Sequence, residues 1–192
     1  MEAEFCEYFQ EIFTSSRPNL AQIDAALDGL LPKITEDMKN HLNQLFTAEE
    51  ILEALNQMCP TKAPGPDGLP AVFFQKHWQA VECGVVSTCL HILNELGNLT
   101  SLNHTYIALI PKVHKPRKVT EFKPISICNV IYRIITKAIA NKMKPILEQI
   151  ISPSQNAFIP NRLITDNIII GYECLHKIRH NKGKRNGLVA LS

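Results

Sequence analysis

Five basic side chains lie within twelve residues of this sequence, in a pattern that could bind an anion. Lys112 ends a β-rich run and Lys123 begins the next, and three more cations, Lys115, Arg117 and Lys118, lie between them. Two extended runs around the turn "HKPRK" predict a β-hairpin that brings Lys112 and Lys123 near each other. Two ammonium groups facing one cleft repel, so a triphosphate or a backbone phosphate would explain the pair. A solvated hairpin tip explains the same residues equally well.

A second candidate is the Gly- and Pro-rich stretch "KAPGPDGLP", residues 62–70. It lacks the GxxxxGK[ST] pattern of a phosphate-binding loop, and its three prolines donate no backbone N–H group. Pro64-Gly65 predicts a type II turn and Asp67-Gly68 a second turn. The composition by itself favours a rigid turn between two helices.

The sequence offers no convincing catalytic centre or metal site. His176 and His180 share a helix face, which is a weak zinc signal without further ligands. Two-metal polymerase or nuclease chemistry needs closely placed carboxylates. The basic half of the chain has only four, far apart in sequence: Glu121, Glu148, Asp166 and Glu173. We therefore expect no catalytic residue and no bound metal in this chain.

The charge is divided unevenly along the 192 residues. Residues 1–60 carry a net charge of −8 and residues 101–192 carry +11, although the whole chain is only +2. A basic half of this kind is typical of proteins that bind nucleic acid or a polyphosphate. No apolar run approaches the length of a membrane span, so we expect no membrane partner. The six scattered cysteines indicate reduced thiols and an intracellular location, in the cytoplasm, the nucleus or both.

The hydrophobic pattern predicts an α+β fold that is mostly helical. Thr47 and Glu50 form a capping-box pattern ahead of an apolar helical face. Residues 1–46 are expected to be an arm that precedes one domain over residues 47–192. Helices are expected at 2–13, 47–58, 71–78, 81–96, 129–150 and 163–180, the hairpin at 104–128, and a final strand at "LVAL", 188–191.

Five stretches of the sequence together resemble a known family. They are "TKAPGPDGLPAVFFQKHW", "LNHTYIALIPKV", "EFKPISICNVIYRIITKAIANKMKPIL", "ISPSQNAFIPNRLITDNIIIGYECLH" and "KGKRNGLVALS". In this order and spacing they are similar to the N-terminal part of the reverse transcriptase domain of non-LTR (LINE-type) retrotransposons, with plant members most similar. The resemblance covers nearly the whole chain. It implies part of a right-hand polymerase fold, with the fingers and an incomplete palm.

The resemblance also implies roles for single residues. Lys112 and Lys123 match the fingers motifs that hold the incoming nucleotide, and Lys62 and Asp67 lie in a loop near the template. Lys123 stands where the family usually has arginine, so the charge is kept but the bidentate fork is lost. Arg162 matches the arginine of a motif that is usually "PGR" and is "PNR" here. Asn161 is tolerable in place of glycine at a positive φ.

One departure decides what activity we expect. The family's first catalytic aspartate follows the strand that resembles "LVAL", and this chain stops at Ser192, about two residues short of it. We therefore expect a fragment that is inactive alone, although the full-length family uses Mg²⁺ and deoxynucleotide triphosphates. The alternative is a non-catalytic module that binds an RNA template or an RNA–DNA hybrid through Lys115, Arg117, Lys118 and their neighbours. A decayed product without function is a third reading.

Overall fold

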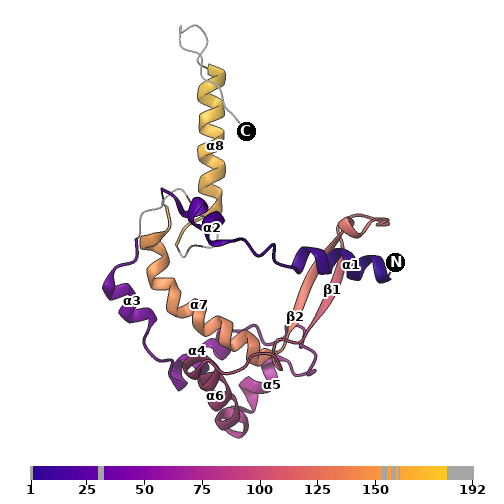
Figure 1. The fold of residues 1–192 in the computed structure, drawn as a ribbon, viewed down its shortest axis with the longest axis vertical. Helices are drawn as coiled ribbons and strands as arrows, with labels where there is room; N and C mark the ends of the chain where they lie inside the picture. Colours follow the sequence, from indigo (N-terminus) through magenta and orange to yellow (C-terminus); the bar gives the residue numbers. More distant parts are fainter. Residues whose placement is uncertain (1, 30–32, 153–154, 157–158, 160, 181–192) are drawn as a thin grey trace. The chain divides into compact units, whose positions relative to one another are not determined.

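The structure is a computed structural model that describes residues 2–29, 33–152, 155–156, 159 and 161–180 (Figure 1). It confirms a mostly helical α+β fold. The predicted strand at 188–191 lies outside the described residues. The elements in chain order are α1 (Glu2–Phe13), α2 (Leu20–Leu27), α3 (Glu36–Leu42), α4 (Ala48–Asn56), α5 (Ala71–Lys76), α6 (Trp78–Glu95), β1 (Thr105–Pro111), η1 (Val119–Glu121), β2 (Phe122–Cys128), α7 (Val130–Ile150) and α8 (Ile164–His180).

The chain forms two compact units that do not divide it at one point of the sequence. Residues 1–32 and 44–139 make up the first unit, and residues 33–43 and 140–192 make up the second. Helix α7 contributes to both. The boundary at residues 46 and 47 between an arm and a domain stays a prediction. No helix in the described part of the chain has the length and apolar character needed to cross a membrane.

The core of the first unit is built by α4, α5, α6 and the start of α7. The capping box that begins α4 is present as predicted, with the Thr47 N–H donating to Glu50 at 2.8 Å. The helix that begins there carries Ile51 and Leu55, which are both fully buried. Burial of each of these side chains stabilises the fold by about 1.5–3 kcal/mol. The core side chains are Ile51, Ala54, Leu55, Ala71, Phe74, Val85, Cys89, Ile92, Val130, Ile134, Ile135 and Ala138.

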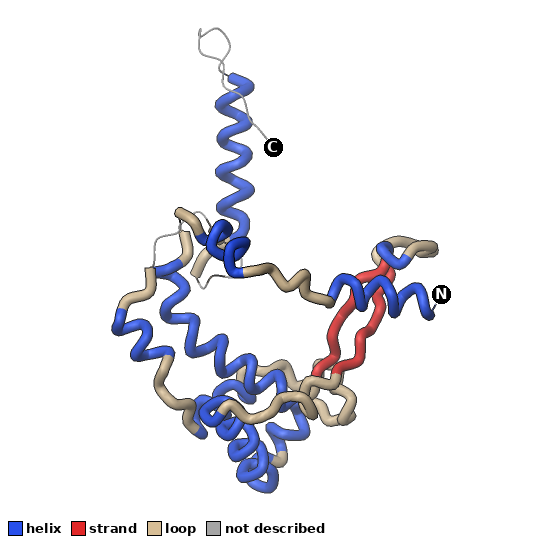
Figure 2. Tube along the Cα trace, in the orientation of Figure 1, coloured by secondary structure: helices blue, strands red, loops and turns tan. Residues whose placement is uncertain are grey.

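The predicted hairpin is present in the first unit. Strands β1 and β2 are antiparallel, and Ala108 lies opposite Ile125 (red in Figure 2). Because side chains alternate across a sheet, the hairpin has two faces. Helix α1 lies along one of them, where the Phe5 ring meets the Phe122 ring edge-on at 5.2 Å. The helix predicted at 2–13 is thus confirmed, and it covers one side of the hairpin.

The type II turn predicted at Pro64-Gly65 is wrong. Such a turn needs a positive φ at its third residue, and among the described glycines only Gly29 and Gly68 have one. The chain instead turns two residues later, where the Gly68 N–H donates to the Gly65 carbonyl at 3.0 Å. Pro66 and Asp67 occupy the centre of this turn. Gly65 is therefore required for a reason other than its φ angle.

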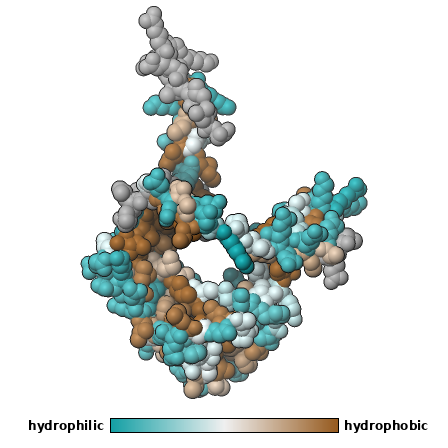
Figure 3. Space-filling view, viewed as in Figure 1, coloured by the Kyte–Doolittle hydropathy of each residue, from teal (hydrophilic) through white to brown (hydrophobic). Residues whose placement is uncertain are grey.

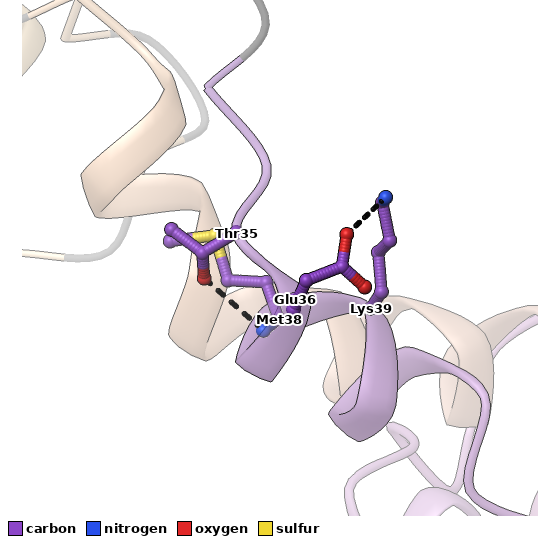
Figure 4. A network of polar contacts seen from close by, with 4 residues as sticks. All are labelled: Thr35, Glu36, Met38 and Lys39. Atoms are coloured by element: carbon purple, nitrogen blue, oxygen red, sulfur yellow. Dashed lines mark hydrogen bonds and ion pairs between the residues drawn. The ribbon is translucent and has the colours of Figure 1, made fainter.

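The second unit contains α3, the end of α7 and α8. Helix α3 begins at a threonine cap, with the Met38 N–H donating to Thr35 Oγ1 at 3.3 Å, and Lys39 pairs with Glu36 at 2.6 Å (Figure 4). The His41 ring contacts the Lys142 carbonyl at 3.2 Å, which ties α3 to α7. Helix α7 continues past Pro145 to Ile150. Helix α8 has no buried residue, and Figure 3 shows hydrophobic surface over part of it.

Candidate nucleic-acid interface

Of the two lysines that flank the hairpin tip, Lys123 lies on β2 and Lys112 directly follows the end of β1. Lys123 is opposite Ile110, and Lys112 follows two residues further toward the tip, where its N–H donates to the Glu121 carbonyl at 2.8 Å. The Lys112 ammonium donates to the Thr120 carbonyl at 2.9 Å. A lysine ammonium carries three donors, so this contact leaves two of them for an anion.

The carboxylate of Glu121 organises the tip of the hairpin. It accepts hydrogen bonds from the backbone N–H groups of Arg117 at 2.6 Å and Lys118 at 3.1 Å. These two bonds, with the nearby Lys118 charge, hold the pKa of Glu121 below its ordinary value. The carboxylate therefore hydrogen-bonds to the backbone of the tip. The side chains of Lys115, Arg117 and Lys118 remain exposed. Lys115 itself has a φ of 58°, which turns the chain at the tip.

Acidification should loosen the tip through Glu121. Since the folded-state pKa of Glu121 is lowered, this carboxylate makes its full contribution to folding stability at any pH above the ordinary glutamate pKa. This contribution is lost as the pH falls through the lower, folded-state value. We expect Glu121→Gln to reproduce the loosening at neutral pH. A carbon-detected NMR titration of the Glu121 carboxyl checks the direction. A midpoint at or above the ordinary glutamate value would contradict it.

The hairpin face opposite α1 combines a cation with exposed rings and aliphatic groups. The register and the strand alternation place Tyr106, Ile110, Lys123 and Ile125 on this face. Tyr106 is 57% exposed and Ile110 is 47% exposed. A base can stack on such a surface while the ammonium contacts its phosphate. The sequence interpretation missed Tyr106 and Ile125, although the alternation in "HTYIALIP" and "FKPISIC" could have found them.

The loop at residues 62–70 is docked onto the residue between β2 and α7. A Cβ atom added at Gly65 would lie 2.5 Å from the backbone nitrogen and from Oδ1 of Asn129. The same Oδ1 accepts the Asp67 N–H at 3.2 Å. Asp67 in turn accepts the Leu69 N–H at 3.1 Å, so its carboxylate shapes the loop. Lys62 and Asp67 are exposed, and their binding of nucleic acid stays a prediction.

Arg162 is engaged with backbone carbonyls of the second unit. Its guanidinium donates to Ser152 at 2.6 Å, Gln155 at 2.8 Å and Glu148 at 3.2 Å. These bonds satisfy carbonyls at the end of α7 and in the loop that follows, a need common to helix ends. Asn161 has a φ of 61°, which confirms that asparagine occupies a positive-φ position here. Nucleotide binding by Arg162 stays a prediction.

The described residues gather no metal-binding cluster. They include no group of three or more His, Cys, Asp or Glu side chains placed to hold an ion. The rings of His176 and His180 stack at 4.0 Å on α8. In this geometry the two rings stack on each other, and no third ligand among the described residues lies near their nitrogens.

Comparison with known proteins gives two relatives, and no family model matches the chain. Over 172 residues, 90% of this chain, it is 28% identical to the Transposon TX1 uncharacterized 149 kDa protein of Xenopus laevis. Over 169 residues, 85% of the chain, it is 24% identical to the Retrovirus-related Pol polyprotein from type-2 retrotransposable element R2DM of Drosophila melanogaster. The chain is homologous to transposable-element proteins. It spans only 13% and 14% of the length of these relatives.

The homology includes the candidate interface. A matched stretch that covers 85% or more of 192 residues must contain the middle of the chain, wherever it starts. The loop at 62–70, the hairpin and Asn129 all lie in that middle part. The arrangement of basic hairpin and docked loop therefore belongs to the region that the chain has in common with transposable-element proteins.

Proposed function

We propose that this chain is the fingers and the start of the palm of a reverse transcriptase from a LINE-type (non-LTR) retrotransposon. The homology to transposable-element proteins over 85–90% of the chain carries this proposal. The basic hairpin and its root supply the supporting geometry. The chain spans about one seventh of the length of those relatives, so the activity of the whole polymerase is also a proposal. We further propose that the protein is located inside the cell.

Within that polymerase, the proposed role of this chain is to bind the nucleic acid. The exposed hairpin face offers Lys123 to phosphate and Tyr106 to a base, and the tip adds Lys115, Arg117 and Lys118. On the other face, α1 places the exposed carboxylates of Glu4, Glu7 and Glu11, which repel a polyanion. The charges therefore direct an RNA template, or an RNA–DNA hybrid, to the face that carries Lys123. In the whole polymerase, the same lysine and Lys112 would contact the triphosphate of a deoxynucleotide.

The residues described here do not fit the magnesium ions that the full-length family uses. Two-metal chemistry needs carboxylates that converge on the ions, and the described residues bring no such group together. No step of nucleotide transfer is therefore assigned to this chain. Its own contribution is to bind and position a polyanionic strand. A non-catalytic RNA-binding module is the second candidate function, favoured by the same basic hairpin.

Salt-dependent RNA binding tests the proposal. The variant Lys115→Gln/Arg117→Gln/Lys118→Gln should bind an RNA–DNA hybrid more weakly. The slope of log K against log salt should fall in magnitude by about 3, because each phosphate contact on a duplex contributes about 0.9. Fluorescence anisotropy at several salt concentrations measures both quantities.

The control removes the same number of charges elsewhere, with Lys144→Gln/Lys177→Gln/Arg179→Gln on α7 and α8. It leaves the net charge equal to that of the hairpin variant and should retain most of the affinity. Equal losses in the two variants would show binding by bulk charge and would contradict a hairpin interface. Equal affinity for duplex DNA of the same sequence would contradict a site adapted to RNA.

A further inference from the structure

Asn129 joins three parts of the first unit at one point. It is 9% exposed and stands between the last residue of β2 and the first residue of α7. Its carbonyl accepts the Arg133 N–H at 3.1 Å, the first helical hydrogen bond of α7. Its side-chain oxygen accepts the Asp67 N–H from a loop more than sixty residues earlier. The root of the hairpin, the start of α7 and the loop therefore all contact this one residue.

The contact with the loop is tight because Gly65 has no side chain. The Gly65 Cα lies so close that a Cβ would sit 2.5 Å from the Asn129 backbone nitrogen and 2.6 Å from its Cα. The turn that follows is closed by the Gly68 N–H and by the Asp67 carboxylate. One side-chain hydrogen bond from Asn129 and one close backbone approach thus hold a loop whose Lys62 and Asp67 face solvent.

We infer that Asn129 is a positioning residue that locks the loop at 62–70 to the root of the hairpin, so that Lys62 and the hairpin lysines act as one continuous binding track. This inference deepens the proposed function and rests on it for the nature of the ligand. Along β2, Asn129 and Lys123 are six residues apart, or about 20 Å at the rise of an extended strand. A strand that contacts both ends of the track must therefore extend over about six base pairs.

Hydrogen exchange tests the lock without any ligand. In Asn129→Ala, deuterium uptake by the segment 62–70 should become about tenfold faster, since the Asp67 N–H loses its acceptor. Uptake by α6 should not change. Asn129→Asp keeps an acceptor at the same position and should restore protection. Asn98→Ala is the matched control, because it removes another asparagine that accepts a loop N–H, that of Thr100 at 2.8 Å. Unchanged exchange at 62–70 in Asn129→Ala would overturn the inference.

RNA binding tests the positioning role by a double-mutant cycle. In the otherwise native chain, Lys62→Gln should weaken binding of a 20-nucleotide hybrid about threefold to tenfold. In the Asn129→Ala background the same change should cost less than about twofold, and Asn129→Asp should restore the full effect. A single-stranded RNA of four nucleotides is too short to span the track, so Lys62→Gln should change its binding equally in the native and Asn129→Ala backgrounds.

The outcomes separate this inference from the proposed function. If exchange responds to Asn129→Ala but the Lys62 effect is the same in both backgrounds, the lock is structural only and the positioning role is wrong. If the native chain binds no RNA at low salt, the proposed function is wrong. The positioning role toward RNA falls with it, while the exchange experiment still decides whether the lock exists.

Discussion

Replacing Gly65 with alanine is expected to destabilise the first unit by about 1–3 kcal/mol, the usual cost of forcing an extra methyl group into a closely packed place. The added Cβ would meet the backbone of Asn129 at 2.5 Å, and backbone cannot move aside as a flexible side chain can. Either the loop or the start of α7 must shift. The melting temperature should fall by roughly 2–4 °C for each kcal/mol.

A matched glycine provides the control for this prediction. Gly84 lies inside α6 and an added Cβ there meets nothing within 4 Å. Because alanine favours a helix over glycine by about 1 kcal/mol, Gly84→Ala should raise stability. The single tryptophan, Trp78, packs against the same core, so its fluorescence follows unfolding of the first unit in urea. Equal effects of the same sign at Gly65 and Gly84 would show that the contact with Asn129 is not restrictive.

Ile134→Ala should destabilise the first unit strongly. Its side chain is fully buried in α7 and belongs to the core to which α4, α5 and α6 also contribute. Removing the buried groups leaves a cavity, and such changes cost about 2–5 kcal/mol. Urea denaturation followed by Trp78 fluorescence measures the change. The loss should appear as a lower midpoint with an unchanged slope.

Ile139 gives the comparison within the same helix. It lies five residues further along α7 and is 40% exposed. Since less of its surface leaves water on folding, Ile139→Ala should cost less than half as much as Ile134→Ala. A similar loss at both positions would contradict burial as the source of the lost free energy, since alanine has the higher helix propensity at both.

Local patterns predicted the elements of this fold well, and contacts between distant residues were not predictable. The capping box at Thr47 and Glu50 involves residues three apart, so the sequence shows both partners at once. The alternation around the basic turn likewise predicted the hairpin. The local sequence Pro64-Gly65 predicted a type II turn. The actual reason for a glycine at position 65 is the close approach of Asn129, which is 64 positions away in the sequence. No pattern in residues 62–70 contains that information.

The candidate site shows the same division. The cations at 112–118 were predictable from composition, but their backbone partners were not. Glu121 is unremarkable in the sequence, and the structure uses it to fix the backbone of Arg117 and Lys118. Arg162 was expected to meet a nucleotide through its family motif, and its guanidinium holds three carbonyls of its own unit. Side-chain charge can be counted from a sequence, whereas the partner of a charge depends on the folded backbone.

The pairing of β1 and β2 also limits how the length of the hairpin can change over evolutionary time. Inserting one residue in a strand reverses which side each later side chain faces. Such an insertion between Phe122 and Lys123 would turn that lysine toward the acidic helix α1. Insertions of two residues in each strand preserve both faces. The strands of the hairpin should therefore change in length by even numbers of residues, and insertions of an odd number should be confined to the tip.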